Sequence, residues 1–170
     1  MKIQETDIKI QKATVADVPA IMALLEKRIR WMDEKKLYQW NKTDYFGVYP
    51  YAYFVKRVEE GVVFVAATGE TIVGVMALLT EDPRWPEPAP ALYVHHLATD
   101  PAIPGLGAQM LTFAEEYSRL SGGDRLRLDC QTVNPALNRY YEKLGYVHAG
   151  RCVDGAYEGN LMEKYLCERK

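Results

Sequence analysis

Apolar residues recur along the chain with two periods, and each period predicts one kind of element. Strict alternation of apolar and polar positions is typical of strands, whereas apolar residues three and four apart are typical of helices. β-branched runs on both sides of a Thr-Gly-Glu turn predict a hairpin over residues 61–79. The tail predicts either two last strands around Asp154-Gly155 or a longer loop. The strand-like segments are residues 7–13, the hairpin, 91–98, 125–132 and the tail, 146–166.

Helical spacing marks four segments of the chain. Thr14 and Asp17 have the spacing of a capping box, which predicts the start of an amphipathic helix. Asn134 and Pro135 are residue types that commonly begin a helix, and Gly145 is typical of a helix end. The helix-like segments are about 18–36, 52–59, 107–121 and 134–145, and residues 40–50 and 81–90 are predicted loops.

The order of these elements indicates the fold class. Three consecutive strands are followed by helix, strand, helix and the strand-like tail, which favours a mixed sheet with helices on both faces. A length of 170 residues favours one domain, residues 1–170, with a substantial core. We therefore expect an α/β (α+β) fold with a mixed, mostly antiparallel central sheet of about seven strands flanked by about four helices.

Composition and charge exclude several classes of protein. Apolar residues make up 48% of the chain and the net charge is −2, so there is no basic field for nucleic acid or an anionic membrane. No apolar run approaches the roughly 20 residues that span a bilayer. The three cysteines are too far apart for a metal-binding pair, and their odd number argues against a disulfide framework. We expect a cytoplasmic protein that binds no metal, membrane or nucleic acid.

A turn that contains two glycines precedes the third helix. Residues 99–110 read TDPAIPGLGAQM and directly follow an apolar strand. A helix begins with unpaired N–H groups and a partial positive charge, and glycines ahead of it let an anion approach closely. The turn is therefore either a diphosphate site or an ordinary tight connection. The candidate donors are the amides of Ile103, Gly105, Leu106, Gly107 and Ala108.

Two named phosphate motifs fit this turn poorly. A P-loop needs a lysine followed by serine or threonine at a fixed spacing, and the sequence has no such match. A dinucleotide-binding fingerprint needs a third glycine or alanine where this chain has Met110, a side chain expected to separate helix from strand. Asp129 lies at a plausible ribose-binding distance along the sequence, so this second motif is weakened and stays an alternative.

Three stretches together resemble the GCN5-related N-acetyltransferase (GNAT) family. Residues 97–101, LATDP, are similar to the family's L-A-V-x-P at the end of its central strand. Residues 105–108, GLGA, are similar to the end of its Q/R-x-x-G-x-G/A turn, with Ala102 at the Q/R position. Asn134 and residues 141–146, YEKLGY, are similar to its N-x6-Y-E-x-x-G-F helix. The resemblance covers nearly all of the chain and implies an acyl-CoA N-acyltransferase-like fold.

The resemblance also implies an activity, the direct transfer of acetyl from acetyl-CoA to a primary amine. The pantetheine arm would pair with the end of the strand like an added strand, and the Leu97 amide would polarise the thioester carbonyl. Ala102 and Pro104 each depart from the family pattern, which removes one side-chain contact and one amide donor. The implied cofactor-binding residues are Leu97, Ala98, Thr99, Ile103, Gly105, Leu106, Gly107, Ala108, Asn134, Asn138 and Tyr141.

Tyr141 is the general acid that the resemblance implies, because its hydroxyl would lie near the sulfur and protonate the thiolate. The alternative is an aromatic half-buried on an amphipathic helix. Cys130 on the next strand is interpreted as a small core residue rather than a nucleophile, and direct transfer needs no acyl-enzyme.

The general base stays open between His95, Tyr93 and water. Tyr93, His95 and Leu97 are expected to share one face of the strand because side chains alternate. Histidine titrates near neutral pH, so His95 suits proton removal from an ammonium group. The alternative for His95 is a packed, hydrogen-bonded core histidine. His96 should face the opposite side and is the weaker candidate.

Aromatic residues are candidates for the walls of the acceptor site. Trp40 and Trp85 lie in loop-like sequence, and with Tyr93 they are predicted to line a pocket for a small-molecule amine. Packing in the core is the alternative for such residues. The sequence names no acceptor, and a homodimer is one assembly that it allows.

Two further functions remain alternatives. The altered glycine turn fits a module of the same fold that senses acyl-CoA without turnover. A nucleotide-binding protein of Rossmann type is disfavoured by Met110.

Overall fold

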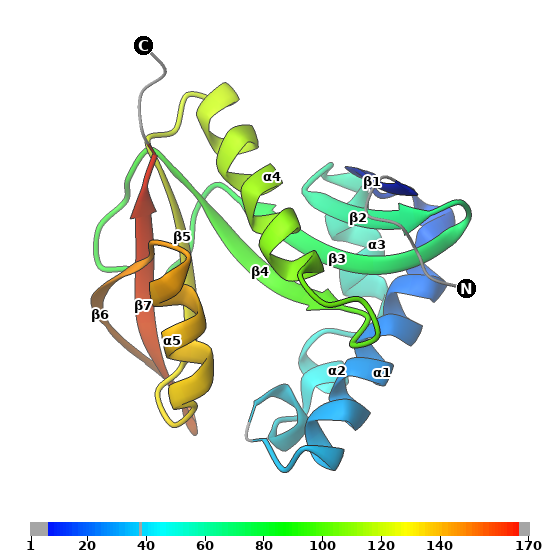
Figure 1. The fold of residues 1–170 in the computed structure, drawn as a ribbon, viewed down its shortest axis with the longest axis horizontal. Coiled ribbons are helices and arrows are strands. Elements are labelled where there is room, and N and C mark those ends of the chain that lie inside the picture. The colour runs from blue at the N-terminus through cyan, green and yellow to red at the C-terminus, as the bar shows by residue number, and fades with distance from the viewer. Residues whose placement is uncertain (1–6, 38, 167–170) are drawn as a thin grey trace. The chain divides into compact units, whose positions relative to one another are not determined.

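The computed structural model describes residues 7–37 and 39–166 (Figure 1). Within these residues, seven strands form one sheet in the order β1-β2-β3-β4-β5-β7-β6. The mixed, mostly antiparallel sheet is confirmed, and the tail forms two strands. The strands are β1 Ile8–Lys12, β2 Val63–Thr68, β3 Thr71–Leu79, β4 Ala91–Thr99, β5 Arg125–Gln131, β6 Val147–Asp154 and β7 Tyr157–Tyr165. The helices are α1 Val18–Glu34, α2 Tyr45–Val48, α3 Tyr51–Glu59, α4 Leu106–Leu120 and α5 Pro135–Lys143, with 3-10 turns η2 Val15–Asp17 and η3 Trp40–Lys42.

The chain divides into two compact units, and each unit is built from two stretches of sequence. The first unit comprises Met1–Ala77 and His96–Met110, and the second comprises Leu78–His95 and Leu111–Lys170. Strands β3 and β4 and helix α4 therefore contribute residues to both units. A single domain over the whole chain stays a prediction.

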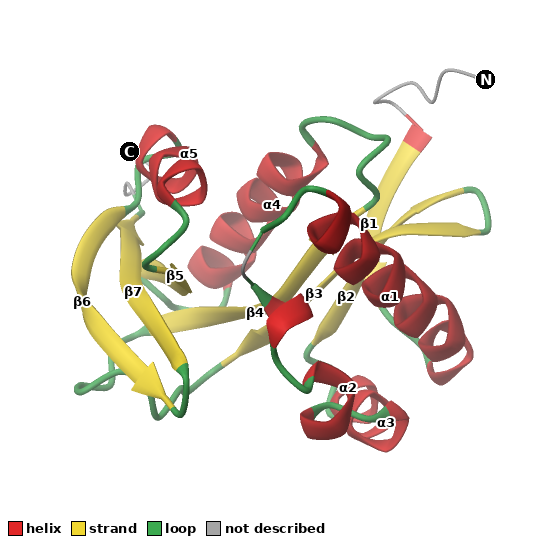
Figure 2. Ribbon diagram, turned by 90° about the horizontal axis from the view of Figure 1, so that it is seen from below, coloured by secondary structure: helices red, strands yellow, loops and turns green. Residues whose placement is uncertain are grey.

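The first unit contains an antiparallel set of strands and the helices α1 to α3. β1 pairs with β2, with Ile8 opposite Thr68, and β2 pairs with β3 across the predicted hairpin. The predicted capping box is confirmed, because Thr14 N–H donates to the Asp17 carboxylate at 2.8 Å. Helix α1 packs against α3 within this unit (Figure 2). The buried residues of α1 are Val18, Ile21, Leu24, Leu25 and Met32.

Gly74 on β3 makes room for Met110, the side chain that we expected to separate helix α4 from the strand. Met110 in α4 is fully buried. A Cβ atom on Gly74 would come within 2.6 Å of the Met110 sulfur and within 3.1 Å of Ala66 Cβ. Met110 therefore packs closely on the strand. In the dinucleotide fold a third glycine of the helix provides this space, whereas in this chain a glycine of the strand provides it.

The second unit contains β5, β6 and β7, the first part of β4, and α5. β4 pairs with β5 in parallel, with Ala91 opposite Arg125, and the β5–β7 and β6–β7 pairs are antiparallel. Helix α5 begins at its predicted cap, since Asn134 Oδ1 accepts from Leu137 N–H at 3.1 Å. It ends before Gly145, whose φ of 97° suits glycine. Figure 1 shows α5 beside β5 and β7.

The predicted loop over residues 40–50 is wrong in one respect, because it contains η3 and the short helix α2. Asp44 caps α2, and its side chain accepts from Gly47 N–H at 3.2 Å. Tyr45 in α2 is 6% exposed, so the helix is held by one buried aromatic. A helix of four residues is too short for a periodic pattern to reveal it.

Candidate active site

Asp100 holds the turn that follows β4. Its N–H donates to Val73 O at 2.8 Å, and its carbonyl accepts from Ile103 N–H at 3.0 Å. Its carboxylate accepts from Ala102 N–H through Oδ1 at 3.0 Å and from the Lys27 ammonium through Oδ2 at 2.9 Å. Burial raises the pKa of Asp100, but these hydrogen bonds outweigh burial and hold the pKa below its usual value. An ionised carboxylate therefore anchors the turn at neutral pH.

The amides that follow this anchor belong to Gly105 and the first residues of α4. Gly105 has a φ of 84°, and nothing lies within 4 Å of the position that a Cβ atom would take. Gln109 N–H donates to Gly105 O at 3.2 Å, so Leu106 and Gly107 precede that bond and their N–H groups have no partner within the helix. These amides and the helix N-terminus favour an anion. Of the predicted donors, Ile103 is instead used inside the turn.

His96 interrupts the regular conformation of β4. Its φ is 56°, in the left-handed region that non-glycine residues seldom adopt. The simple alternation expected to carry Tyr93, His95 and Leu97 along one face is therefore interrupted between His95 and Leu97. Such a conformation costs about 1–3 kcal/mol, so it needs support from the side chain's surroundings.

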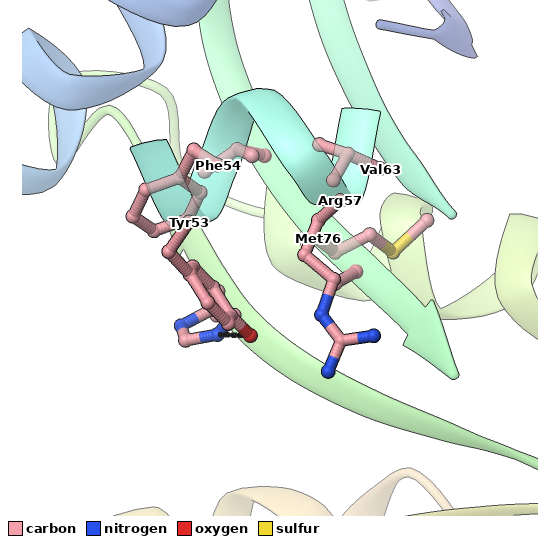
Figure 3. A pocket seen from close by; sticks show the side chains of 8 residues that line it. Tyr53, Phe54, Arg57, Val63 and Met76 are labelled. Atoms are coloured by element: carbon pink, nitrogen blue, oxygen red, sulfur yellow. Dashed lines mark hydrogen bonds between the residues drawn. The ribbon is translucent and has the colours of Figure 1, made fainter. Parts of the chain in front are cut away.

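Aromatic side chains of α2 and α3 enclose the His96 ring. Its Nδ1 is hydrogen-bonded to the Tyr45 hydroxyl, and its Nε2 lies 3.0 Å from the Tyr53 hydroxyl (Figure 3). The rings of Tyr49 and Phe54 lie 4.5 and 5.3 Å from the imidazole centroid. Burial, with the neighbouring tyrosines, raises the pKa of Tyr45, so its hydroxyl stays protonated. Both ring nitrogens are engaged by phenols, which supports a packed, positioning role for His96.

A small pocket in the first unit lies between α3 and the strands. Figure 3 shows Tyr53 and Arg57 of α3, Val63 of β2 and Met76 of β3 among the side chains that line it. The Arg57 guanidinium lies 5.4 Å from the Tyr53 ring and pairs with Glu60 at 2.9 Å. The remaining lining residues are Phe54, Val75, Ala77 and His96. The pocket is therefore mainly apolar, and its cation is already paired.

His95 belongs to the second unit and faces a carboxylate. Its Nε2 lies 2.9 Å from Asp82 Oδ2, in the loop between β3 and β4. The two side chains are 17% and 3% exposed. Burial raises the pKa of Asp82, but hydrogen bonds from His95 and from Arg84 N–H outweigh it and hold the pKa below its usual value. The carboxylate therefore fixes the orientation of the His95 ring.

Trp85 and Tyr93, two of the residues predicted to line the acceptor pocket, contact Arg127 of β5. The Arg127 guanidinium donates to the Tyr93 hydroxyl at 3.0 Å and lies 4.1 Å from the centroid of the Trp85 ring. It also pairs with Glu163 at 3.0 Å. Tyr93 and Trp85 are 2% and 8% exposed, so both are core residues of the second unit. Trp40 lies in η3, and its side chain is outside the described part of the structure.

Helix α5 carries Tyr141, which is 9% exposed. Asn138, one turn earlier, uses both ends of its amide inside the unit. Its Nδ2 donates to Gln131 O at 3.0 Å and to Asn134 O at 2.8 Å, and its Oδ1 accepts from Asn160 Nδ2 at 2.7 Å. Asn138 therefore fixes α5 to β5 and β7, and with it the position of Tyr141.

Cys130 is a buried residue of β5, as its residue type suggested. Its thiol donates to Asn138 Oδ1 at 3.2 Å. Burial, with the charge of Asp129, raises the pKa of Cys130 to about 12, so the thiolate is scarce at neutral pH. Residues 7–37 and 39–166 contain no cluster of three or more His, Cys, Asp or Glu side chains suited to a metal. Among the same residues, no helix is both long and apolar enough to cross a membrane.

Sequence reasoning missed the partners of these groups. Asp82, Lys27, Tyr45 and Tyr53 each contact a functional segment that is at least a dozen residues away along the chain. The only local signal was an acidic residue beside a proline in the loop over residues 81–90. No periodic pattern relates such distant positions, so only the folded chain could show them.

Comparisons with known proteins identify the family of this chain. The model of the Acetyltransferase (GNAT) family matches residues 25–146. YesJ of Bacillus subtilis strain 168, an uncharacterised N-acetyltransferase, is 27% identical in an alignment 185 residues long. The alignment covers 95% of this chain and 98% of YesJ.

Two solved structures share the fold. The PaiA N-acetyltransferase of Thermoplasma acidophilum, in complex with coenzyme A, aligns with a TM-score of 0.76 at 18% identity over 93% of this chain and 98% of that one. The structure of yncA from Salmonella typhimurium, with its cofactor acetyl-CoA, aligns with a TM-score of 0.66 at 18% identity over 96% of each chain. Because the family match spans most of the sequence and takes in β4, the glycine turn and α5, this chain belongs to the GNAT acetyltransferase family.

Proposed function

We propose that this chain is an acetyl-CoA-dependent N-acetyltransferase that acetylates a primary amine of a small molecule by direct transfer. The observation that carries the proposal is the turn over residues 99–107, where Asp100 anchors the chain and the N-terminus of α4 begins at Leu106, directly after Gly105. Coenzyme A and acetyl-CoA in two solved structures of the same fold support this choice of cosubstrate.

In this proposal the cofactor is bound mainly by the main chain. The amides of Gly105, Leu106, Gly107 and Ala108 hold the diphosphate, because they lie at the positive end of α4. Leu97, Ala98 and Thr99 pair with the pantetheine arm, and the Leu97 N–H polarises the thioester carbonyl. Asn134 and Asn138 contribute by fixing α5.

The transfer needs a base and an acid. His95 takes a proton from the acceptor's ammonium group, and the amine nitrogen then attacks the thioester carbon. The C–S bond breaks, and the Tyr141 hydroxyl gives its proton to the thiolate. The second proton that the amine nitrogen loses on forming the amide restores the tyrosine hydroxyl. We choose His95 over Tyr93 and His96 because the Tyr93 hydroxyl is bonded to Arg127 and both nitrogens of His96 to tyrosines. Water is the remaining alternative for the base.

Direct transfer is favoured over an acetyl-enzyme intermediate. The thiol of Cys130 is buried, its pKa is raised and it donates to Asn138. A protonated, bonded thiol is a poor nucleophile. The amine itself therefore attacks the thioester.

One observation favours a second candidate, a sensor that binds acyl-CoA without turnover. Ala102 N–H and Ile103 N–H are both used inside the turn, and Pro104 has none. Fewer donors remain for the phosphates than the family pattern implies. A weaker diphosphate site suits a protein that reports acyl-CoA concentration.

Two measurements on the purified chain separate these functions. We expect coenzyme A, and not NAD, to raise the melting temperature, because a ligand stabilises the fold that binds it. We expect acetyl-CoA to release free thiol in the presence of at least one member of a panel of small primary amines. Coenzyme A binding without turnover for any amine or lysine peptide would favour the sensor, and no binding of coenzyme A would refute both.

A further inference from the structure

The carboxylate of Asp82 accepts a hydrogen bond on each of its oxygens. Oδ1 accepts from Arg84 N–H at 2.9 Å, and Oδ2 lies 2.9 Å from His95 Nε2. The Asp82 side chain is 3% exposed, so water competes little for either oxygen. An ionised carboxylate has no proton to donate. The hydrogen atom of the second bond must therefore come from His95.

This requirement determines which ring nitrogen of the neutral His95 imidazole carries the proton. With its proton on Nε2, His95 presents Nδ1 as the nitrogen that can accept another. The geometry points to Asp82 as a positioning residue for His95: it holds the proton on Nε2 and so makes Nδ1 the atom that receives the acceptor's proton. This inference deepens the proposed function, on which the role of His95 as base rests.

A network of side chains keeps Asp82 in place. The Arg84 guanidinium lies 3.4 Å from the Asp129 carboxylate on β5 and 3.1 Å from Asp154 Oδ2 on β6. Tyr157 on β7 donates to Asp129 Oδ2. The loop that carries Asp82 is thus tied to three strands of its own unit.

Two protons leave the acceptor nitrogen: His95 takes one, and the other restores the Tyr141 hydroxyl after that hydroxyl has protonated the thiolate. Nδ1 takes one proton from the acceptor's ammonium group, and the imidazolium that forms still donates from Nε2 to Asp82. The adjacent carboxylate stabilises this cation. After acetyl transfer, Nδ1 returns the proton to solvent, and the starting tautomer is restored.

The substitution Asp82→Asn tests the inference because it keeps the shape of the side chain and replaces one acceptor oxygen by an NH₂ donor. The amide oxygen of asparagine is expected to retain the hydrogen bond from Arg84 N–H. Its NH₂ group would then face His95 Nε2 as a donor, which forces the imidazole proton onto Nδ1. An equivalent exchange in a serine protease triad lowers kcat by about 10⁴-fold through the wrong tautomer. In this chain we expect kcat to fall by about 10²-fold or more, with the coenzyme A dissociation constant unchanged.

The direct readout is the ¹⁵N spectrum of histidine-labelled protein at a pH where the imidazoles are neutral. The chain has three histidines, so the His95 signals are assigned by their absence in His95→Gln. Wild-type protein should show a protonated Nε2 and an unprotonated Nδ1, and Asp82→Asn should show the reverse. Asp82→Glu should keep the wild-type tautomer and recover part of kcat.

Asp124→Asn is the matched control. It makes the same chemical change outside the network that holds Asp82, on a side chain that is 55% exposed and pairs with Arg125. It should leave both the tautomer and kcat within about twofold of wild type, while melting curves confirm that all variants fold.

The outcomes separate the inference from the proposed function. An unchanged His95 tautomer in Asp82→Asn overturns the inference, whatever the activity. A reversed tautomer with undiminished kcat also overturns it, because His95 would then not need Asp82. A reversed tautomer in a protein whose wild type acetylates no amine upholds the proton placement and refutes the proposed enzyme.

Discussion

The glycine turn of the first unit and the loop over residues 80–90 of the second present functional groups of different kinds. The turn presents backbone N–H groups, which exist whatever side chains the chain carries, and Asp100 fixes their direction. The loop presents the carboxylate of Asp82 to the imidazole of His95, and neither group has a substitute. The comparison indicates that cofactor binding should tolerate many side-chain changes, whereas proton transfer should tolerate few. This difference can be tested by substitutions in each of the two segments.

The largest effect is expected at His95. Loss of a general base commonly lowers the rate by about 10²–10⁴-fold, so His95→Ala should lower kcat by that order and leave coenzyme A affinity unchanged. His96→Ala is the neighbouring control, and it should lower the melting temperature with a much smaller effect on kcat. Steady-state kinetics and calorimetric titration with coenzyme A measure the two quantities. If both variants lost kcat equally, the two histidines would not differ in role.

The next effect is expected in the glycine turn. Gly107→Glu places a negative charge near the proposed diphosphate, and like charges in contact cost several kcal/mol. The dissociation constant of coenzyme A should therefore rise by about 100-fold, since 1.4 kcal/mol corresponds to tenfold. Gly107→Ala adds bulk without charge and should change affinity much less. Undiminished binding by a folded Gly107→Glu protein would remove the phosphate site from the turn.

A smaller effect is expected at Tyr141. Tyr141→Phe keeps the buried ring and removes only the hydroxyl, so kcat should fall by about 10–100-fold while coenzyme A affinity stays unchanged. Tyr140→Phe, at an exposed ring on the same helix, is the control. An unchanged kcat in Tyr141→Phe would exclude it as the acid.

The smallest effect tests whether the turn lacks a side-chain contact. Ala102 is exposed and uses only its backbone N–H within the turn, so its side chain can be changed without breaking the anchor. Ala102→Arg should tighten coenzyme A binding by about threefold to tenfold, in a manner that added salt weakens. Ala102→Met serves as the size control. Equal affinities for the two variants would show that backbone groups alone carry the phosphate contact.

Local signals in the sequence were sufficient wherever a few neighbouring residues decide the structure. The capping box of Thr14 and Asp17, the cap at Asn134 and the end of α5 before Gly145 all depend on residues within a few positions. The glycine turn is local in the same way, because the start of α4 and the glycine ahead of it create the open amides together. Strand-like sequence also located β1 to β5, and of the two alternatives left open for the tail the structure has the two strands.

Contacts between distant residues were decided only by the tertiary structure. Met110 was interpreted from the helix alone, and the glycine that accommodates it lies on β3. The two histidines are neighbours in sequence, yet one is bonded to Asp82 and the other to Tyr45 and Tyr53. Periodicity and the backbone preferences of single residues were enough to predict the strands, the longer helices and the turn, but not η3 or the four-residue helix α2. The protonation and packing of each histidine depend on which distant side chains the fold brings within hydrogen-bonding distance, and no local pattern contains that information.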